Sequence, residues 1–284
     1  MIISIIIPTF NNLAYLKFFL SSIKENSNFK HEIILHINDG SDGTLKYAMD
    51  NNIKYTHSKN NIGLCSSMNK AYSLTTTDYI LYAHDDMYFC KNWDYFLISE
   101  INKHMNNLYY LTGTNVSTRH GLINFDCGDH LSNFDKNKFD EFCLNDDTHD
   151  LQGSHWAPHL IHRDLWEKIG GFSEEFDPGD GSDPDLCMKL WLSNVRIFKG
   201  VSKFKVYHFN SITTRNNKIF LNNGTKQFLL KYGFNPRFFR KYYLRGNNSI
   251  IPFIGDLTEP KMNFFMIKDL FINKIKYFIL KFIS

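Results

Sequence analysis

The sequence of 284 residues has little cysteine, and its thiols show no paired spacing. The five cysteines are an odd number and form no Cys-x-x-Cys pair. Small secreted domains that depend on disulfides normally have an even number of cysteines. The cysteine content therefore favours reduced thiols and predicts a cytoplasmic protein.

Long uncharged apolar runs are also absent. No stretch reaches about 18 such residues, the length that a membrane-spanning helix needs. The N-terminal segment MIISIIIPTF is apolar, but it has no basic leader and is interrupted by Pro8. We therefore expect neither a signal peptide nor a span there. Any membrane association is expected to be peripheral, on the inner face of the membrane.

Acidic residues are scarce in the last third of the chain. Residues 201–284 contain 15 Lys and Arg against 3 Asp and Glu, a net charge of +12, whereas residues 1–200 contain 17 against 26, a net of −9. Such asymmetry predicts an anionic partner for the basic end. A nucleic acid, an anionic lipid surface or a phosphorylated substrate would each fit this charge.

Strand-like and helix-like patterns alternate along the first hundred residues. Apolar runs predict strands at ISIIIPTF, HEIILHIND, IKYTHS and DYILYA. Helical spacing follows Asn11 and Asn12, which can cap that helix, and it recurs over 44–49 and 64–74. This alternation predicts an α/β fold with a mostly parallel central sheet flanked by helices.

The pattern changes further along the chain. Residues 120–150 are typical of loops, and HLIHRDLWEKI then predicts a strand followed by a short helix. A Gly/Pro/Asp loop leads into another helix, whose Leu186, Leu190 and Trp191 are expected to face inward. RIFKGVSKFKVYHF is typical of a pair of strands ending at His208.

The segment 262–284 has the pattern of a basic amphipathic helix. Lysines lie off one helical face, and that face carries the apolar residues Phe264, Ile267, Phe271, Ile275, Phe278 and Phe282. Such a helix can lie in an anionic membrane interface or pack on its own domain, and the sequence leaves both open. We expect residues 216–284 to form a basic helical extension of a domain that spans 1–215.

The ends of three predicted strands carry polar sets, at 8–11, 38–41 and 84–86. Ligands gather at the carboxyl ends of parallel strands, so these three loops predict one site. Asp85 and Asp86 directly follow a buried strand. Solvent, a basic side chain or a metal ion must compensate this pair of charges.

Six motifs, taken in order, resemble those of family 2 glycosyltransferases of the GT-A fold. They are SIIIPTFNN, INDGSDGT, NNIGLCSSMNKAY, DYILYAHDDMYF, IHRDLWEKIGGFSEEF and SDPDLCMKLW, and they cover roughly residues 1–210. The resemblance implies transfer of a sugar from a nucleotide-diphosphate sugar, usually UDP-linked, to an acceptor hydroxyl. It also implies Mn²⁺ or Mg²⁺ as cofactor, and a glycan or lipid-linked saccharide as acceptor.

Three positions depart from the family pattern. Ala83 or His84 stands at the first position of the Asp-x-Asp metal motif. Asn38 replaces the first acidic residue of the turn after the second strand, and Met68 stands where an Arg is usual. These departures leave the identity of the donor open.

The resemblance implies a metal site that neutralises the departing diphosphate. Asp86 is then a metal ligand, and Asp85 contacts ribose hydroxyls or the water shell of the ion. His208 supplies a further ligand from the far side. Taken in isolation, the two aspartates favour a solvated turn, and a single histidine beside aromatic residues is more typical of a core position.

The resemblance also implies which residues contact the nucleotide. Asp39 would accept a hydrogen bond from the imide of the base, Pro8, Thr9 and Asn11 would line the base pocket, and Gly63 would let the backbone approach the nucleotide. The alternatives are a simple turn at Asp39 and a helix-entry glycine at Gly63.

Three further side chains have two interpretations each. Arg215 and Lys218 fit either a segment that closes over the diphosphate or a solvated loop. Trp156 fits either stacking on a sugar ring or a buried position.

The segment SDPDL corresponds to the acidic pair that holds the general base in the family. Asp183 is then the base of an inverting transfer, since one carboxylate suffices to take the proton of the acceptor. The alternative is a helix N-cap at Asp183 with Pro184 as the first helical residue. Asp185 would lie in the first turn, where a carboxylate favours the helix dipole.

Two other classes of protein compete with the transferase. A nucleotidyltransferase would need a Gly-rich phosphate-binding loop, which IPTFNNLAYLK does not offer. A non-catalytic nucleotide-binding or membrane-associated module would leave Asp85, Asp86, Asp183 and His208 without a role. Nucleic acid is not an expected partner, because it would not explain the acidic site.

Overall fold

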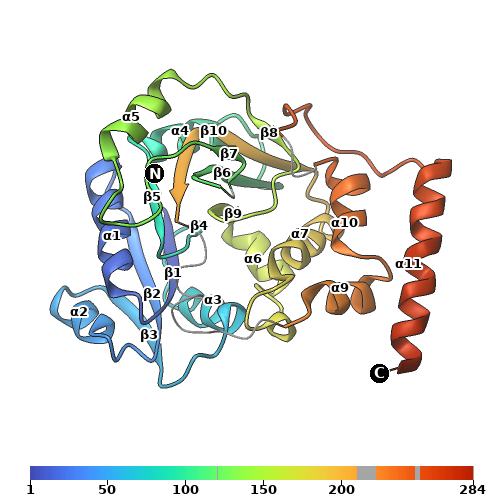
Figure 1. Ribbon diagram of the computed structural model, residues 1–284, viewed down its shortest axis with the longest axis horizontal. Coiled ribbons are helices and arrows are strands. Elements are labelled where there is room, and N and C mark those ends of the chain that lie inside the picture. The colour runs from blue at the N-terminus through green and yellow to red at the C-terminus, as the bar shows by residue number, and fades with distance from the viewer. Residues whose placement is uncertain (120, 210–221, 247–249, 284) are drawn as a thin grey trace.

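A computed structural model describes residues 1–119, 121–209, 222–246 and 250–283 (Figure 1). Its strands are β1 (Ser4–Phe10), β2 (Glu32–Asn38), β3 (Lys54–Ser58), β4 (Tyr79–Tyr82), β5 (Met87–Phe89), β6 (Tyr109–Ser117), β7 (Ile123–Asn124), β8 (Leu151–Gln152), β9 (His159–His162) and β10 (Ile197–His208). They form one sheet in the order β3-β2-β1-β4-β9-β6-β10-β5, with β7 on β6 and β8 on β10.

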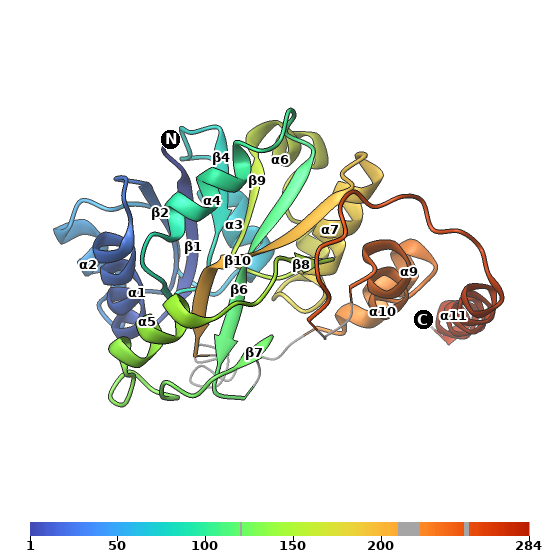
Figure 2. The ribbon, with the colours of Figure 1, turned by 90° about the horizontal axis from the view of Figure 1, so that it is seen from above.

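Helices flank this sheet (Figure 2). They are α1 (Leu13–Asn26), α2 (Thr44–Asp50), α3 (Leu64–Tyr72), α4 (Trp93–Ile101), α5 (Lys136–Asn145), α6 (Arg163–Ile169), the 3-10 turn η1 (Glu174–Phe176), α7 (Ser182–Leu192), α9 (Gly224–Tyr232), α10 (Pro236–Phe239), the π-helical turn η2 (Arg240–Leu244) and α11 (Phe264–Ile283).

The sheet is mixed and its first half is parallel. Strands β1 to β4 pair in parallel, because each is reached through a crossover, whereas β9 runs antiparallel to both β4 and β6. Leu186, Leu190 and Trp191 on α7 are buried, as predicted. The predicted α/β fold with a mostly parallel sheet flanked by helices is confirmed.

Two local predictions are wrong. Residues 120–150 contain the helix α5, which Asp135 caps by accepting a hydrogen bond from the Lys138 backbone amide at 3.0 Å. Its pattern is weak because Phe139 is its one buried residue. The expected strand pair at 196–209 is one strand, β10, whose register with β6 shifts between Val201 and Lys205.

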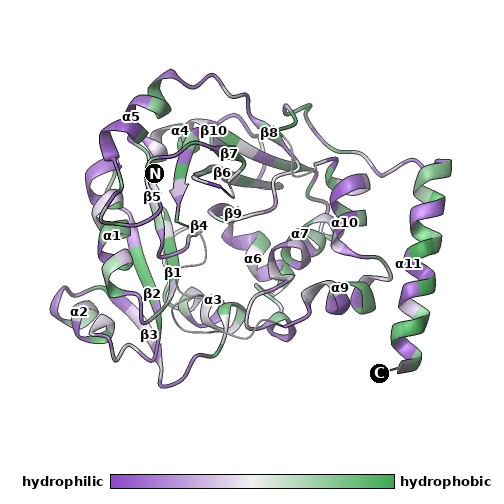
Figure 3. Cartoon of the chain, in the orientation of Figure 1, coloured by the Kyte–Doolittle hydropathy of each residue, from purple (hydrophilic) through white to green (hydrophobic). Residues whose placement is uncertain are grey.

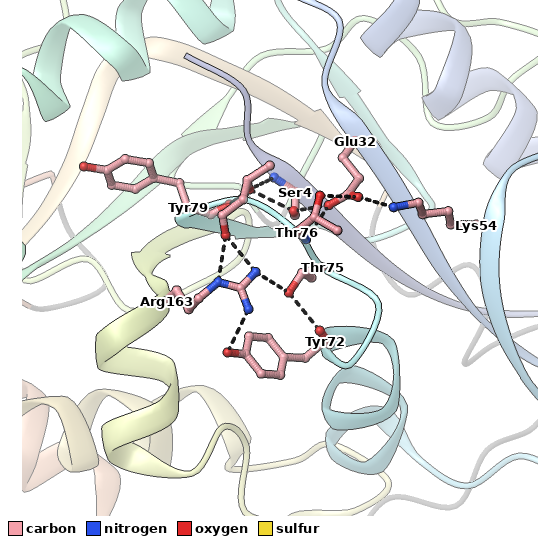
Figure 4. Close-up of polar contacts among 9 residues, drawn as sticks. Ser4, Glu32, Lys54, Tyr72, Thr75, Thr76, Tyr79 and Arg163 are labelled. Atoms are coloured by element: carbon pink, nitrogen blue, oxygen red, sulfur yellow. Dashed lines mark hydrogen bonds and ion pairs between the residues drawn. The ribbon is translucent and has the colours of Figure 1, made fainter.

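A polar network holds the amino-terminal ends of β1 and β2 (Figure 4). The polar loops lie at the opposite, carboxyl-terminal ends of these strands. Arg163 at the start of α6 donates to the Thr77 carbonyl at 3.0 Å and to the Thr75 hydroxyl at 2.9 Å. Glu32 accepts a hydrogen bond from Lys54 at 2.5 Å. Burial opposes ionisation of Glu32, but such hydrogen bonds lower its pKa to about 2. The network fixes the amino-terminal ends without contributing to a site.

The C-terminal helix α11 lies at one end of the molecule, and in both views α9 and α10 lie between it and the sheet (Figures 1 and 2). Asp269 accepts hydrogen bonds from Lys241 at 2.8 Å and from Tyr242 at 2.7 Å. Asn273 accepts one from the Asn235 amide at 2.9 Å. A partly polar face of α11 therefore holds the helix to the rest of the chain.

The apolar face predicted for α11 points away from the protein, and green bands run along the helix in Figure 3. Exposed fractions along this face reach 65% at Phe271 and 88% at Phe282. The buried Met266 and Asn273 lie on the opposite side. Of the helices in the described segments, none combines the length and the apolarity that a membrane crossing requires.

Candidate active site

The carboxyl ends of β1, β2 and β4 meet at a cavity of about 200 Å³, called here the first cavity. It brings together residues that are far apart in the sequence: Pro8, Thr9, Phe10, Asn38, Asn61, Gly63, Leu64, Tyr82, His84, Asp85, Asp86, Pro178 and His208. Six of the residues predicted for the site are in this set: Pro8, Thr9, Gly63, Asp85, Asp86 and His208.

Two imidazoles and one carboxylate converge in the first cavity. His208 Nε2 lies 3.0 Å from Asp86 Oδ1 and 3.2 Å from His84 Nδ1. Ligand atoms of these three residues all lie within 4.8 Å of one another. Imidazole nitrogen with carboxylate oxygen is a donor set that fits a divalent transition metal such as Mn²⁺. Burial, and then the charge of His208, lowers the pKa of His84 to about 4, so its ring is in the neutral form that binds metals.

His208 reaches this position through strand pairing. In the antiparallel pair of β10 and β5, His208 stands opposite Met87, one residue after Asp86. The Phe209 amide then donates to the Asp86 carbonyl at 3.1 Å. His84 is not among the predicted ligands, although an imidazole at the first position of the metal motif was a usable signal.

Asp85 is held by the segment after β1. Its Oδ2 accepts a hydrogen bond from the Thr9 hydroxyl at 2.6 Å, and its Oδ1 accepts one from Asn12 Nδ2 at 3.0 Å. Asn12 is the N-cap residue of α1, but its side chain does not cap the helix as predicted. Asp42 accepts from the Leu13 amide instead, at 2.8 Å. The contact of Asp85 with ribose stays a prediction.

Asn11 and Asp39 lie together but outside the lining of the first cavity. Asn11 Nδ2 donates to Asp39 Oδ2 at 2.8 Å, and Asn11 Oδ1 accepts from the Gly40 amide at 3.0 Å. The hydrogen bond from Asn11 lowers the pKa of Asp39. These contacts build the turn, while the neighbouring Asn38 lines the cavity. Recognition of the base by Asp39 stays a prediction.

Gly63 is the N-cap residue of α3 and has a φ of +88°. A Cβ at this position would lie 2.2 Å from Asp177 Oδ1. Asp177 accepts hydrogen bonds from the Cys65 amide at 2.7 Å and from the Ser66 hydroxyl at 2.6 Å. The geometry thus explains the glycine by helix entry and by the approach of Asp177, and it also places Gly63 at the cavity wall.

A second cavity, of about 540 Å³, lies beyond the loop 177–181. Pro178 lines the first cavity, and Gly179 lines the second. The second cavity is lined by His155, Trp156, Gly179, Asp180, Gly181, Asp183, Pro184, Thr225, Asn235, Pro236, Arg237 and Arg240. Seven of these twelve residues come from the helix α7 or from the helical segments after residue 222.

Asp183 is the second residue of α7 and lines the second cavity. The N-cap residue is Gly181, so the alternative of Asp183 as an N-cap is wrong. Within the described segments, no hydrogen-bond or ion-pair partner of the Asp183 carboxylate is found. Burial raises its pKa to about 7. Such a carboxylate can accept a proton near neutral pH.

Asp185 has the opposite environment. Its carboxylate is 1% exposed and accepts hydrogen bonds from Ser173 at 2.6 Å and from Tyr232 at 2.7 Å. Lys231 forms an ion pair with it at 2.8 Å. Asp185 therefore joins α7 to α9, rather than only serving the first turn of its own helix.

Trp156 lines the second cavity with Asp183, and its indole nitrogen donates to the Gly113 carbonyl at 3.0 Å. Its contact with a sugar stays a prediction. Arg215 and Lys218 lie outside the described residues, so their predicted place over the diphosphate also stays a prediction.

Comparison with known proteins identifies the family. The model of Glycosyl transferase family 2 matches residues 4–170, more than half of the chain, and the protein belongs to this family. The predicted family is confirmed. No curated protein matches the sequence.

Solved structures show the same fold at low sequence identity. S. aureus TarS 1-349 matches with a TM-score of 0.55 at 18% identity, over 73% of this chain and 60% of that one. GalNAc-T7 with UDP, GalNAc and Mn²⁺ gives 0.57 at 14%, over 79% and 45%. The mannosyltransferase PcManGT from Pyrobaculum calidifontis, in complex with GDP-Man and Mn²⁺, gives 0.51 at 12%, over 72% and 56%. The chain thus spans 60% or less of the length of each.

Proposed function

We propose that the protein is an inverting glycosyltransferase. It moves a hexosyl or N-acetylhexosaminyl group from a UDP-linked sugar to a hydroxyl of a glycan or lipid-linked saccharide. One observation carries this proposal. Asp183, a carboxylate with a raised pKa and no partner in the described segments, stands across one loop from the His84, Asp86 and His208 group.

The donor side of the proposal is supported by the first cavity and by the similar structures. TarS has been solved with UDP and with UDP-GlcNAc, and PcManGT with GDP-Man. His84, Asp86 and His208 would hold Mn²⁺ or Mg²⁺, which when bound neutralises charge on the diphosphate leaving group. Asp85 and Thr9 shape the wall beside this group.

The acceptor side uses Asp183. Its carboxylate takes the proton of the acceptor hydroxyl as the hydroxyl attacks the anomeric carbon from the face opposite to the diphosphate. Asp180, the other carboxylate that lines the second cavity, accepts a hydrogen bond from the Gly224 amide at 2.9 Å. Among the described residues that line the second cavity, Asp183 is the carboxylate without a partner, which favours a single displacement that inverts the anomeric centre.

A thermal-shift panel tests the donor side. UDP, dTDP, GDP and CDP are each added with and without Mn²⁺, since a ligand that binds only the folded state stabilises it. We expect UDP with Mn²⁺ to raise Tm for the wild type and to lose most of that effect with Asp86→Ala. Equal shifts for all four nucleotides, or none, would contradict the proposal.

We further propose that α11 attaches the enzyme to an anionic membrane surface. The helix is held by one face, while its opposite, apolar face is exposed and has Lys268 on one flank and Lys274 and Lys281 on the other. Apolar burial and attraction of lysines to anionic headgroups act together in this geometry. A membrane-bound enzyme would favour a lipid-linked acceptor.

Vesicle cosedimentation tests the attachment. The double variant Phe271→Ser and Phe278→Ser should lose binding to vesicles of phosphatidylglycerol and phosphatidylcholine. Leu144→Ser is the matched control, because Leu144 is 82% exposed on α5 and its loss should leave binding unchanged. Binding that survives the double variant, or that does not require phosphatidylglycerol, would refute an anionic surface as the partner.

A further inference from the structure

Two arginines line the second cavity together with Asp183. Arg237 lies on α10 and Arg240 begins η2, so they are three residues apart on one continuous helical stretch and occupy neighbouring positions on its surface. Arg237 is exposed, and Arg240 is half-buried. No sequence motif pointed to either residue.

Neither guanidinium has a hydrogen-bond or ion-pair partner within the described segments. Two arginines elsewhere show the usual pattern: Arg163 donates to the Thr77 carbonyl, and Arg196 pairs with Glu259 at 2.5 Å. Burial, and then the like charge of Arg237, lowers the pKa of Arg240. A half-buried cation whose neighbouring charge is another cation costs free energy unless an anion joins it.

The carboxylates of the cavity do not supply that anion. Asp180 is exposed and is bound to the Gly224 amide. Among the described residues, no ion pair joins Asp183 to either guanidinium, and burial raises the pKa of Asp183. The guanidiniums and the base therefore act at separate places in a cavity of about 540 Å³.

Two further residues that line the second cavity with the arginines, His155 and Trp156, add no charge to it. His155 is buried and contacts the Gly153 carbonyl through Nδ1 at 3.0 Å, and burial lowers its pKa to about 4, so it adds no charge. Trp156 offers part of its indole to the same cavity. The first cavity shares no lining residue with this one, so the arginines lie outside the expected site of the donor diphosphate.

We propose that the second cavity binds an acceptor saccharide that carries an oxyanion, a phosphate or a carboxylate, on Arg237 and Arg240, with its reacting hydroxyl at Asp183. This inference rests on the proposed glycosyl transfer. The planar guanidinium fork binds two oxygens of such a group at once. The cavity falls within the range of about 300–1,000 Å³ that small-molecule sites occupy.

Binding of defined probes tests this inference on the full chain with UDP and Mn²⁺ present. The probes are glucose, glucose 6-phosphate, glucuronate and prenyl-diphosphate-linked N-acetylglucosamine in detergent micelles. We expect at least one anionic probe to bind tenfold or more tightly than glucose. Binding of glucose 6-phosphate or glucuronate would place the oxyanion on the saccharide, and binding of the lipid-linked probe alone would place it in the diphosphate link. Equal affinity for all four, or no binding of any, would overturn the inference.

Variants then assign the effect to the two arginines. Arg237→Gln and Arg240→Gln should each weaken the anionic probe at least tenfold and leave glucose unaffected. Arg240→Lys keeps the charge and should recover part of the loss. Lys226→Gln, on the neighbouring α9 and outside the cavity lining, is the control and should change nothing. Unchanged affinity in both Gln variants would overturn the inference.

Hydrolysis of the donor by water separates this inference from the proposed function. Metal-dependent release of UDP without any acceptor reports the donor site, and the two Gln variants should retain it within about twofold. If the wild type releases no UDP and binds none, the proposed function fails. If UDP release is normal but anionic and neutral probes bind equally, only the anionic acceptor fails.

Discussion

The two cavities differ in how their charged groups are held. In the first cavity Asp85 is fixed by Thr9 and Asn12, and Asp86 is fixed by His208. In the second cavity Asp183 and the two arginines have no such partners among the described residues. Under the proposed function, the first cavity is therefore preorganised for one constant chemical group, a metal-bound nucleotide. Under the same proposal, the second cavity presents charged groups that an acceptor of variable structure must satisfy.

Among the effects that we predict, the loss of activity on removal of the base should be the largest. Asp183→Asn is expected to lower kcat/KM for transfer by about 10²–10⁴, because general-base catalysis contributes factors of that size. Binding of UDP with Mn²⁺ should stay as in the wild type, since Asp183 lines only the second cavity. Asp180→Asn changes the other carboxylate that lines the second cavity, and as the control it should retain transfer. Transfer above a tenth of the wild-type rate in Asp183→Asn would place the base elsewhere.

Loss of a metal ligand should affect the first cavity alone. His84→Ala and His208→Ala are each expected to raise the Mn²⁺ concentration for half-maximal activity by about 10–100-fold, as loss of groups that hold or orient a metal commonly does. Titration of activity with Mn²⁺ measures this. If both variants respond to Mn²⁺ like the wild type, the His84, Asp86 and His208 group does not hold the ion.

The pH profile should report the raised pKa of Asp183. The base must be ionised, so kcat/KM is expected to fall about tenfold per pH unit below pH 7 and to level off above it. Rates measured between pH 5.5 and 8.5 at saturating Mn²⁺ give this profile. A plateau that extends unchanged to pH 5.5 would show a base with an ordinary carboxyl pKa.

The smallest expected effect is on stability. A carboxyl whose pKa is higher in the folded state than in the unfolded state binds its proton more tightly when folded, so it destabilises the fold increasingly from about pH 4 to about pH 7. Asp183→Asn should therefore raise Tm at pH 8 by about 2–4 °C, or about 1 kcal/mol after allowance for solvent screening of a partly exposed group. At pH 4 the two proteins should melt together. A lower Tm for the variant at pH 8 would contradict this account.

The first cavity could largely be predicted from sequence, because short motifs at strand ends build it. Pro8, Thr9, Asp85 and Asp86 each follow a buried apolar run, and parallel strands bring such loops together. The approach of His208 needed the antiparallel pair of β10 and β5, which local sequence does not specify.

The second cavity could not be predicted in the same way. Asp183 came from a motif, but Arg237 and Arg240 belong to a segment with several basic residues, and no local pattern distinguishes those that line a site. Their position depends on the packing of α10 against α7, a long-range contact without a local pattern. For α11 the sequence defined the apolar face, whereas which face would contact the protein depended on Asp269 and Asn273.

The ion pair of Asp185 with Lys231 determines where the chain can be divided. A fragment that ended before α9 would leave a carboxylate that is 1% exposed without Lys231 and Tyr232, and a buried charged group that loses its partners destabilises the fold. Helices α7 and α9 must therefore be inherited and exchanged together. Within the described part of the chain, helix α11 has no comparable tie to a buried charge, so it is the module that evolution or an engineer can replace without rebuilding the catalytic body.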